Sequence, residues 1–360
     1  MKAFNKTATS AFVVLIAGAL LMVSCKKESG GTSNPTASQL DPGKGAGGDV
    51  LTLTGSDLAK VQSIVFDKGN VPASFNPNFN TAGAVIFRVP DTAIGGTQNI
   101  VFTNIDGKTL TVPFEVIALP KITSASNYDF VTGTQITLTG NNLENVSAVV
   151  LNGTTDAATI VSKSHKTLVI QMPATVATLA KLKITNNYGT TVTSQEFASI
   201  TNNFIVFAED FGAGAYAAGV QSWSFDCNAY SSTDFAVLGA KSLRADYTKD
   251  GGGLSLFLGC NWATPNLTFS DFFAAKYLTF WARAVGSQMN ITIVPDNPWS
   301  GNDIWGAATA TGSVSQVVPK DTWTYFKIPA GSFSGKYSRI DIKILGGTGT
   351  IYYDDILFVQ

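Results

Sequence analysis

The residues best suited to chemistry in this chain are tryptophans set among small polar residues near the C-terminus. All six tryptophans follow residue 203. Trp299 and Trp305 fall in a run rich in Gly, Asn and Asp, and Trp262 follows the short stretch Gly259–Asn261. Such loops cannot bury every indole cheaply, and exposed aromatic side chains on loops are where binding residues concentrate. The three tryptophans are therefore predicted to contact a ligand.

The chemistry they predict is stacking. Indole faces pack on the C–H faces of sugar rings, while sugar hydroxyls need polar partners such as Asn302, which lies between two of the tryptophans. Trp281 and Arg283 alternate with apolar residues along a predicted strand and are expected to line a groove. A tryptophan covered by a loop is the alternative. The candidate glycan-binding residues are Trp262, Trp299, Trp305, Trp281, Arg283 and Asn302.

Catalytic groups are scarce. The single histidine, His165, lies in a turn-like Ser-Lys-Ser-His-Lys stretch without a sequence-adjacent metal partner, which favours a solvated loop residue. Glycoside hydrolysis needs two carboxylates about 5–10 Å apart, but Asp354 and Asp355 are adjacent and a strand would point them to opposite faces. The net charge is −1 and no Lys/Arg run is present, which argues against a nucleic-acid partner. We therefore expect a binding protein that requires no cofactor.

The elements that must position these residues are strands. Charged residues make up 14% of the chain and hydrophobic residues 45%, and β-branched residues and turn formers are frequent. After residue 203, alternating patterns predict a jelly-roll sandwich, with Leu278, Phe280 and Ala282 sharing its core face. The predicted strands are Phe204–Phe207, Ser242–Tyr247, Leu254–Leu258, Tyr277–Ala284, Met289–Val294, Thr322–Ile328, Arg339–Leu345 and Thr350–Val359.

An internal repeat precedes this domain. The run Gly48–Leu58 recurs as Gly133–Leu143, each with a Leu/Ile-Thr-Leu-Thr-Gly strand. Leu51 and Leu53 are predicted to point inward, and the following glycine is expected to occupy a turn with positive φ. Short alternating strands between Gly/Asn/Asp turns are typical of antiparallel sandwiches.

The N-terminus reads as an export signal. Residues 1–24 combine two lysines with a 14-residue uncharged apolar run, Ala11–Ser24, whereas a membrane span needs about 20 residues. The run ends in Leu21-Met22-Val23-Ser24-Cys25, which resembles a lipobox and predicts lipidation of Cys25. An ordinary signal peptide with an incidental cysteine is the alternative. Residues 25–39 are polar and are predicted to be a flexible tether.

The two remaining cysteines, Cys227 and Cys260, form an even pair in an oxidising compartment. Either a disulfide or two buried thiols fits this count, because spacing alone does not decide pairing.

The repeats resemble IPT/TIG domains, which are immunoglobulin-like modules, and the boundaries predicted are 40–118 and 119–200. Because both copies lack basic loops, we interpret them as spacers. Residues 201–360 resemble jelly-roll carbohydrate-binding modules, through Leu278–Trp281, Thr322–Pro329 and Tyr352–Ile356. The fold expected for the whole chain is all-β: two IPT/TIG sandwiches followed by a jelly roll.

The complete layout resembles the surface glycan-binding lipoproteins of Bacteroidota polysaccharide-utilisation loci, which end in a xyloglucan-binding-type domain. This resemblance implies an outer-membrane lipid anchor, exposure at the cell surface and capture of a polysaccharide or oligosaccharide. It also implies a glycan transporter and surface hydrolases as partners. Many jelly-roll modules hold a structural calcium ion, for which Glu209, Asp210 and Asp354 are candidate ligands; solvated turn acids are the alternative.

Two other functions remain open from the sequence. A surface adhesion or structural protein would use its aromatic residues in the core and have no glycan affinity. A glycoside hydrolase would release reducing ends from polysaccharides.

Overall fold

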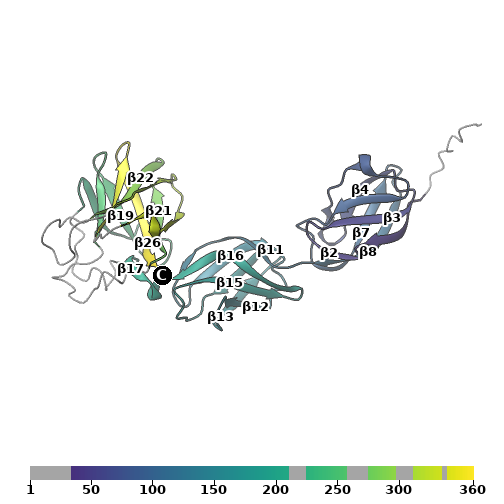
Figure 1. The fold of residues 1–360 in the computed structure, drawn as a ribbon, viewed down its shortest axis with the longest axis horizontal. Coiled ribbons are helices and arrows are strands. Elements are labelled where there is room, and N and C mark those ends of the chain that lie inside the picture. Colours follow the sequence, from purple (N-terminus) through teal and green to yellow (C-terminus); the bar gives the residue numbers. More distant parts are fainter. Residues whose placement is uncertain (1–33, 211–223, 258–274, 297–310, 335–338) are drawn as a thin grey trace, which may run out of the picture. The chain divides into compact units, whose positions relative to one another are not determined.

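The computed structural model describes residues 34–210, 224–257, 275–296, 311–334 and 339–360. These residues form strands joined by turns, which confirms the all-β prediction (Figure 1). Helices in the described ranges are single 3₁₀ turns, and none is long and apolar enough to cross a membrane. The chain divides between Ile117 and Ala118 into two compact units.

The first unit is a two-sheet sandwich built from the first sequence repeat. One sheet has the order β1-β3-β6 and the other β2-β8-β7-β4-β5. Leu51 and Leu53 are fully buried between them, as their alternation predicts. The strands are β1 (Thr36–Asp41), β2 (Lys44–Ala46), β3 (Val50–Ser56), β4 (Val61–Phe66), β5 (Val71–Pro72), β6 (Ala84–Arg88), β7 (Gly96–Asn104) and β8 (Thr109–Ile117). Because β1 pairs with β3 from Thr36 onward, the predicted tether is too long at its C-terminal end.

The second repeat forms a similar sandwich at the start of the second unit. Its strands follow the order β10-β16-β15-β12-β13-β14-β11-β9, with β13 paired to both β12 and β14. Ile136 and Leu138 of β11 are fully buried, matching the leucines of β3. The strands are β9 (Lys121–Ala125), β10 (Asp129–Phe130), β11 (Gln135–Asn141), β12 (Ala148–Leu151), β13 (Ala157–Lys163), β14 (Thr167–Gln171), β15 (Leu179–Asn186) and β16 (Gly189–Ser199).

The repeated glycine has a different role from the one predicted. Gly55 and Gly140 do not have positive φ; that conformation belongs instead to Asp57 and Asn142, two residues later. A Cβ on Gly55 would lie 1.9 Å from a carbonyl oxygen of β1, and one on Gly140 would lie 1.8 Å from a carbonyl oxygen of β9. The glycines are required because a neighbouring backbone approaches too closely for any side chain.

The C-terminal domain contains ten described strands. Four predicted spans have the same bounds as the strands in the structure, namely Phe204–Phe207, Ser242–Tyr247, Tyr277–Ala284 and Arg339–Leu345. Two strands, β18 and β23, were not predicted. The strands are β17 (Phe204–Phe207), β18 (Cys227–Ser232), β19 (Ser242–Tyr247), β20 (Gly253–Phe257), β21 (Tyr277–Ala284), β22 (Met289–Asp296), β23 (Val314–Val318), β24 (Thr324–Pro329), β25 (Arg339–Leu345) and β26 (Gly349–Val359).

These strands pack as two sheets. The β26 sheet has the order β18-β19-β26-β21-β24, with β17 also paired to β26, and the β25 sheet has the order β20-β25-β22-β23. Leu278 and Phe280 of β21 meet Ile342 of β25 in the core between the sheets, as the alternation predicts. The opposite face of β21 is therefore the outer face of the β26 sheet.

The second repeat domain covers part of that outer face. Ala198 and Ile200, at the end of the repeat domain, form an apolar cluster with Leu357 and Val359 of β26. All four side chains are at most 4% exposed. Burial of this apolar surface holds the two domains together within the second unit.

Candidate functional site

Most of the predicted ligand contacts lie outside the described residues. These are Trp262, Trp299, Trp305 and Asn302, together with the cysteines Cys25 and Cys260. The structure does, however, place the strand ends from which the tryptophan-bearing segments leave. Phe257 of β20 and Asp296 of β22 both pair with Arg339 of β25.

The last residues of β20 and β22 and the first residue of β25 therefore lie at the same end of the β25 sheet. Segments 258–274 and 297–310 follow β20 and β22, and segment 335–338 precedes β25. Neighbouring strands are about 4.8 Å apart, so the starting points of the segments lie close together. Polar side chains interact on the outer face at this end: the Arg339 Nη2 donates to Asp341 Oδ2 at 3.0 Å, and the Ser255 hydroxyl donates to Asp341 Oδ1 at 2.9 Å.

Trp281 does not line a groove. Its side chain is on the outer face of β21, as predicted, but it is only 6% exposed. Tyr128 of the repeat domain stacks on it, with ring centroids 6.0 Å apart and an interplanar angle of 14°. The prediction that Trp281 contacts a ligand is therefore wrong, because a neighbouring domain occupies the surface that a sugar would need.

The polar centre of this contact is Asp129, which is fully buried. Its carboxylate accepts a hydrogen bond from Trp281 Nε1 at 3.0 Å and another from the Tyr325 hydroxyl at 3.2 Å. Burial raises the pKa of Asp129 to about 8; the two hydrogen bonds oppose this change, and the charge of Asp354 adds to it.

Arg283 remains partly accessible, with 20% of its side chain exposed. Its guanidinium lies 4.1 Å from the ring centroid of Phe235 and 3.8 Å from Asp321 Oδ1. Arg283 belongs to a cross-strand row that the sequence reasoning missed. Tyr230 is opposite Arg244, Arg244 is opposite Tyr352, and Tyr352 is opposite Arg283. We call these four residues the tyrosine–arginine row.

Carboxylates hold the row in place. Arg244 Nη1 donates to Asp234 at 3.2 Å and its Nε donates to Asp246 at 3.0 Å. The Tyr352 hydroxyl donates to Asp234 at 2.7 Å, and this hydrogen bond is the main cause that lowers the pKa of Asp234. The row was missed because β18 was not predicted, and because residues from four strands come together only through the register of the sheet.

The predicted calcium ligands make hydrogen bonds and an ion pair in the described structure. Both Glu209 carboxylate oxygens accept a hydrogen bond from the Ala240 backbone N–H at 3.0 Å, and Asp354 Oδ2 accepts one from Val237 N–H at 2.7 Å. Asp210 is 3.8 Å from the Lys241 ammonium. Asp354 holds the loop between β18 and β19 against β26, and Glu209 and Asp210 hold the same loop against the segment that follows β17.

Within the described ranges, no group of three or more His, Cys, Asp or Glu side chains is arranged to hold a metal ion. The calcium site at Glu209, Asp210 and Asp354 therefore stays a prediction.

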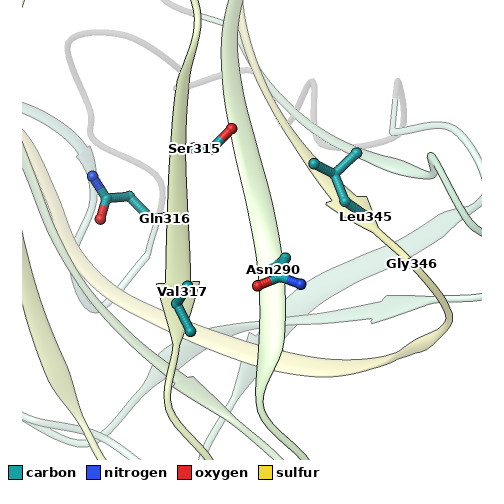
Figure 2. A pocket seen from close by; sticks show the side chains of 6 residues that line it. All are labelled: Asn290, Ser315, Gln316, Val317, Leu345 and Gly346. Carbon is teal, nitrogen blue, oxygen red and sulfur yellow. The ribbon is translucent and has the colours of Figure 1, made fainter.

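The outer face of the β25 sheet carries a shallow hollow of about 520 Å³. Figure 2 shows Ser315 and Val317 on one strand beside Asn290 on the next, with Leu345 and Gly346 at the far side. Among the residues that the structure describes, its lining contains no aromatic ring. Those residues offer hydrogen bonds and aliphatic contact.

Comparisons with known proteins identify one domain family and similar solved structures. The IPT/TIG domain family matches residues 120–199. No curated protein sequence matches the chain. The structure is similar to the surface glycan-binding protein PbSGBP-B from Prevotella bryantii, with a TM-score of 0.52 and 18% identity over 91% of this chain and 99% of that chain.

A second similar structure is SGBP-B from a complex xyloglucan utilization locus in Bacteroides uniformis. Its TM-score is 0.43, with 16% identity over 91% of this chain and 100% of that chain. At 18% identity, the similarity to the Prevotella bryantii structure shows a shared fold. Residues 120–199 are thus an IPT/TIG domain, in a chain with the all-β fold of the Prevotella bryantii surface glycan-binding protein.

Proposed function

We propose that the C-terminal domain binds a polysaccharide or oligosaccharide at the cell surface and does not cleave it. The observation that carries this proposal is the pairing of Phe257 and Asp296 with the same residue, Arg339. Because of this pairing, the segments that contain Trp262, Trp299 and Trp305 begin at the same end of the β25 sheet. Aromatic residues grouped on loops above a packed sandwich are a common way to build a binding surface.

Stacking supplies the binding energy in this proposal, and Asn302 supplies polar contacts. An aromatic platform contributes about 1–3 kcal/mol per stacked ring at comparable sites. A surface function is supported by the shared fold with a protein named as a surface glycan-binding protein.

The acids of β26 do not favour a hydrolase. Asp354 and Asp355 are at most 2% exposed, so a polymer has no access to them. Asp354 also accepts hydrogen bonds from two backbone N–H groups, those of Val237 and Asp355. These contacts support a structural role for the pair, in place of the acid and base that hydrolysis requires.

The remaining parts of the chain fit a surface display system. Cys25 is the proposed lipid anchor in the outer membrane, and the two repeat domains are the proposed spacers that carry the C-terminal domain outward. A glycan transporter and surface hydrolases are the proposed partners. Replacement of Cys25 by serine should move the protein from the membrane fraction to the soluble fraction. If the variant and the wild type are distributed alike between the two fractions, Cys25 does not carry a lipid anchor.

Affinity electrophoresis tests the binding proposal. The wild type and the variants Trp262→Ala, Trp299→Ala and Trp305→Ala are run in native gels containing neutral β-glucans, xylans or mannans. Retardation of the wild type that is weakened in the tryptophan variants is the expected result. Phe79→Ala, which removes a 70% exposed ring from the first unit, is the matched control and should run as the wild type does.

Three variants that bind as tightly as the wild type would contradict the proposed site. A wild type that binds no polysaccharide would favour the adhesion or structural function instead.

A further inference from the structure

The outer face of the β26 sheet has a covered half and an open half. The repeat domain covers Trp281, Tyr325 and Leu357. The other half, across β18, β19 and the first part of β26, carries Tyr230, which is 46% exposed, and the loop residue Phe235, which is 38% exposed. Large exposed aromatic side chains that share one sheet face indicate a contact site.

The tyrosine–arginine row gives this surface a regular geometry. Its four residues are direct cross-strand neighbours, so the row runs across the strands for about 14 Å, at about 4.8 Å per step. The Arg244 guanidinium carbon lies 5.7 Å from the ring centroids of both Tyr230 and Tyr352. This length suits a short oligosaccharide segment better than a single sugar ring.

The loop that follows β18 adds Phe235 to one end of the row. Its ring meets Tyr352 edge to face, with centroids 5.0 Å apart, and Arg283 covers it at 4.1 Å. Tyr230 and Phe235 are thus two exposed rings with fixed hydrogen-bonding groups between them. Side chains held in this way lose little conformational entropy when a ligand binds.

The charges of the row select the ligand class. Arg244 is paired with Asp234 and Asp246, and Arg283 is 3.8 Å from Asp321. The Lys320 ammonium also lies 4.0 Å from Asp321. Three cationic groups therefore face three carboxylates, and these groups leave no excess positive charge for a uronate or a sulfated sugar. The surface does offer ring faces and a mixture of donors and acceptors, which is the combination that an uncharged sugar chain recognises.

We infer that the tyrosine–arginine row, with Phe235, is a contact surface for an uncharged glycan segment, separate from the tryptophan-bearing end of the β25 sheet. Tyr230 and Phe235 supply the stacking faces, and Arg244 with its two aspartates supplies hydrogen bonds to hydroxyls. This inference rests on the proposed glycan-binding function, to which it adds a second surface and a preference for neutral chains.

Titration calorimetry with a neutral β-glucan, xylan or mannan that retards the wild type tests the inference. Tyr230→Ala removes an exposed ring that does not contribute to the core, and it should weaken binding by about 5- to 150-fold. Tyr230→Phe keeps the ring and loses only the hydroxyl, which lies 3.4 Å from Asp246, so its affinity should stay close to that of the wild type. Phe79→Ala is the control for removing an exposed ring elsewhere.

The same measurement with polygalacturonate tests the charge argument, and no binding is expected. Wild-type affinity in Tyr230→Ala, with weakened binding in the tryptophan variants, would overturn this inference and leave the proposed function standing. Tighter binding of polygalacturonate than of the neutral chains would overturn the assigned ligand class. A wild type that binds no neutral glycan would overturn both the inference and the proposed function.

Discussion

The indole Nε1 of Trp281 donates a 3.0 Å hydrogen bond to Oδ2 of Asp129, across the boundary between the IPT/TIG domain and the C-terminal domain. Both residues are buried. The hydrogen bond lies beside the apolar cluster that contains Ile200 and Leu357. The second repeat domain is thus packed directly on the C-terminal domain, so it stabilises that domain.

Substitution of Trp281 should affect stability and leave glycan affinity intact. Trp281→Ala removes a large buried side chain and should lower the free energy of unfolding of the second unit by about 3–5 kcal/mol. Trp281→Phe keeps a ring but leaves Asp129 without one donor, at a cost of about 1–3 kcal/mol. Chemical denaturation measures both changes. Loss of glycan binding without a loss of stability would show instead that Trp281 touches the ligand.

Asp129 should make the stability of this unit depend on pH. Its pKa is raised from 3.8 to about 8, so between these values the folded state keeps a proton that the unfolded state loses. Stability should therefore fall as pH rises from about 4 to about 8 and level off above that.

Asp129→Asn removes this contribution while keeping an oxygen that can accept a hydrogen bond from Trp281. Its melting temperature, followed by calorimetry from pH 5 to pH 9, should fall less steeply than that of the wild type. A residual slope is expected, because the pKa of the buried Asp354 is also raised, to about 7. Parallel profiles for the two proteins would mean that Asp129 does not titrate in this range.

The close backbone contact at Gly140 gives a test of the repeat fold. An alanine Cβ there would lie 1.8 Å from the Lys121 carbonyl oxygen, so β9 would have to move. Gly140→Ala should destabilise the second unit by about 1–3 kcal/mol. Gly331→Ala is a suitable control, because a Cβ at Gly331 meets no atom within 4 Å. Equal melting temperatures for the two variants would contradict the close approach of β9.

Cys227 should be unreactive in the folded protein. Its thiol is buried, and burial together with the nearby charge of Asp246 raises its pKa to about 12. In a Cys260→Ser variant, which removes the predicted pairing partner, reaction with a thiol reagent at pH 8 should be on the order of a thousandfold slower than in urea. Rapid labelling of the native variant would place Cys227 at an accessible position. Intact mass of the unreduced wild type decides the predicted disulfide separately.

Alternating apolar residues were sufficient to predict most of the described strands of the C-terminal domain. The strand Tyr277–Ala284 was predicted because Leu278, Phe280 and Ala282 repeat with the period of a strand buried on one face. The strand at Cys227–Ser232 was missed because its sequence, CNAYSS, contains only small and polar residues around one tyrosine. It lies at the edge of the β26 sheet, where a strong apolar pattern is not required.

The candidate site was harder to predict, for two physical reasons. Alternation placed Trp281 correctly on the face opposite Phe280, but a sequence pattern does not reveal which domain covers a face. The row that includes Tyr230 depends on the register of four strands, which is fixed by long-range pairing and not by local sequence. Both features follow from contacts between residues that are distant in the chain, such as Asp129 and Trp281.

The most direct test of the account measures binding and hydrolysis in the same sample. The purified wild-type protein is incubated with each neutral polysaccharide, bound protein is measured by pull-down with the insoluble polymer or by gel retardation, and reducing ends are assayed in parallel. We expect retention by at least one neutral polysaccharide with no release of reducing ends. Release of reducing ends, or the absence of retention by every polymer tested, would contradict the proposed non-catalytic glycan binding.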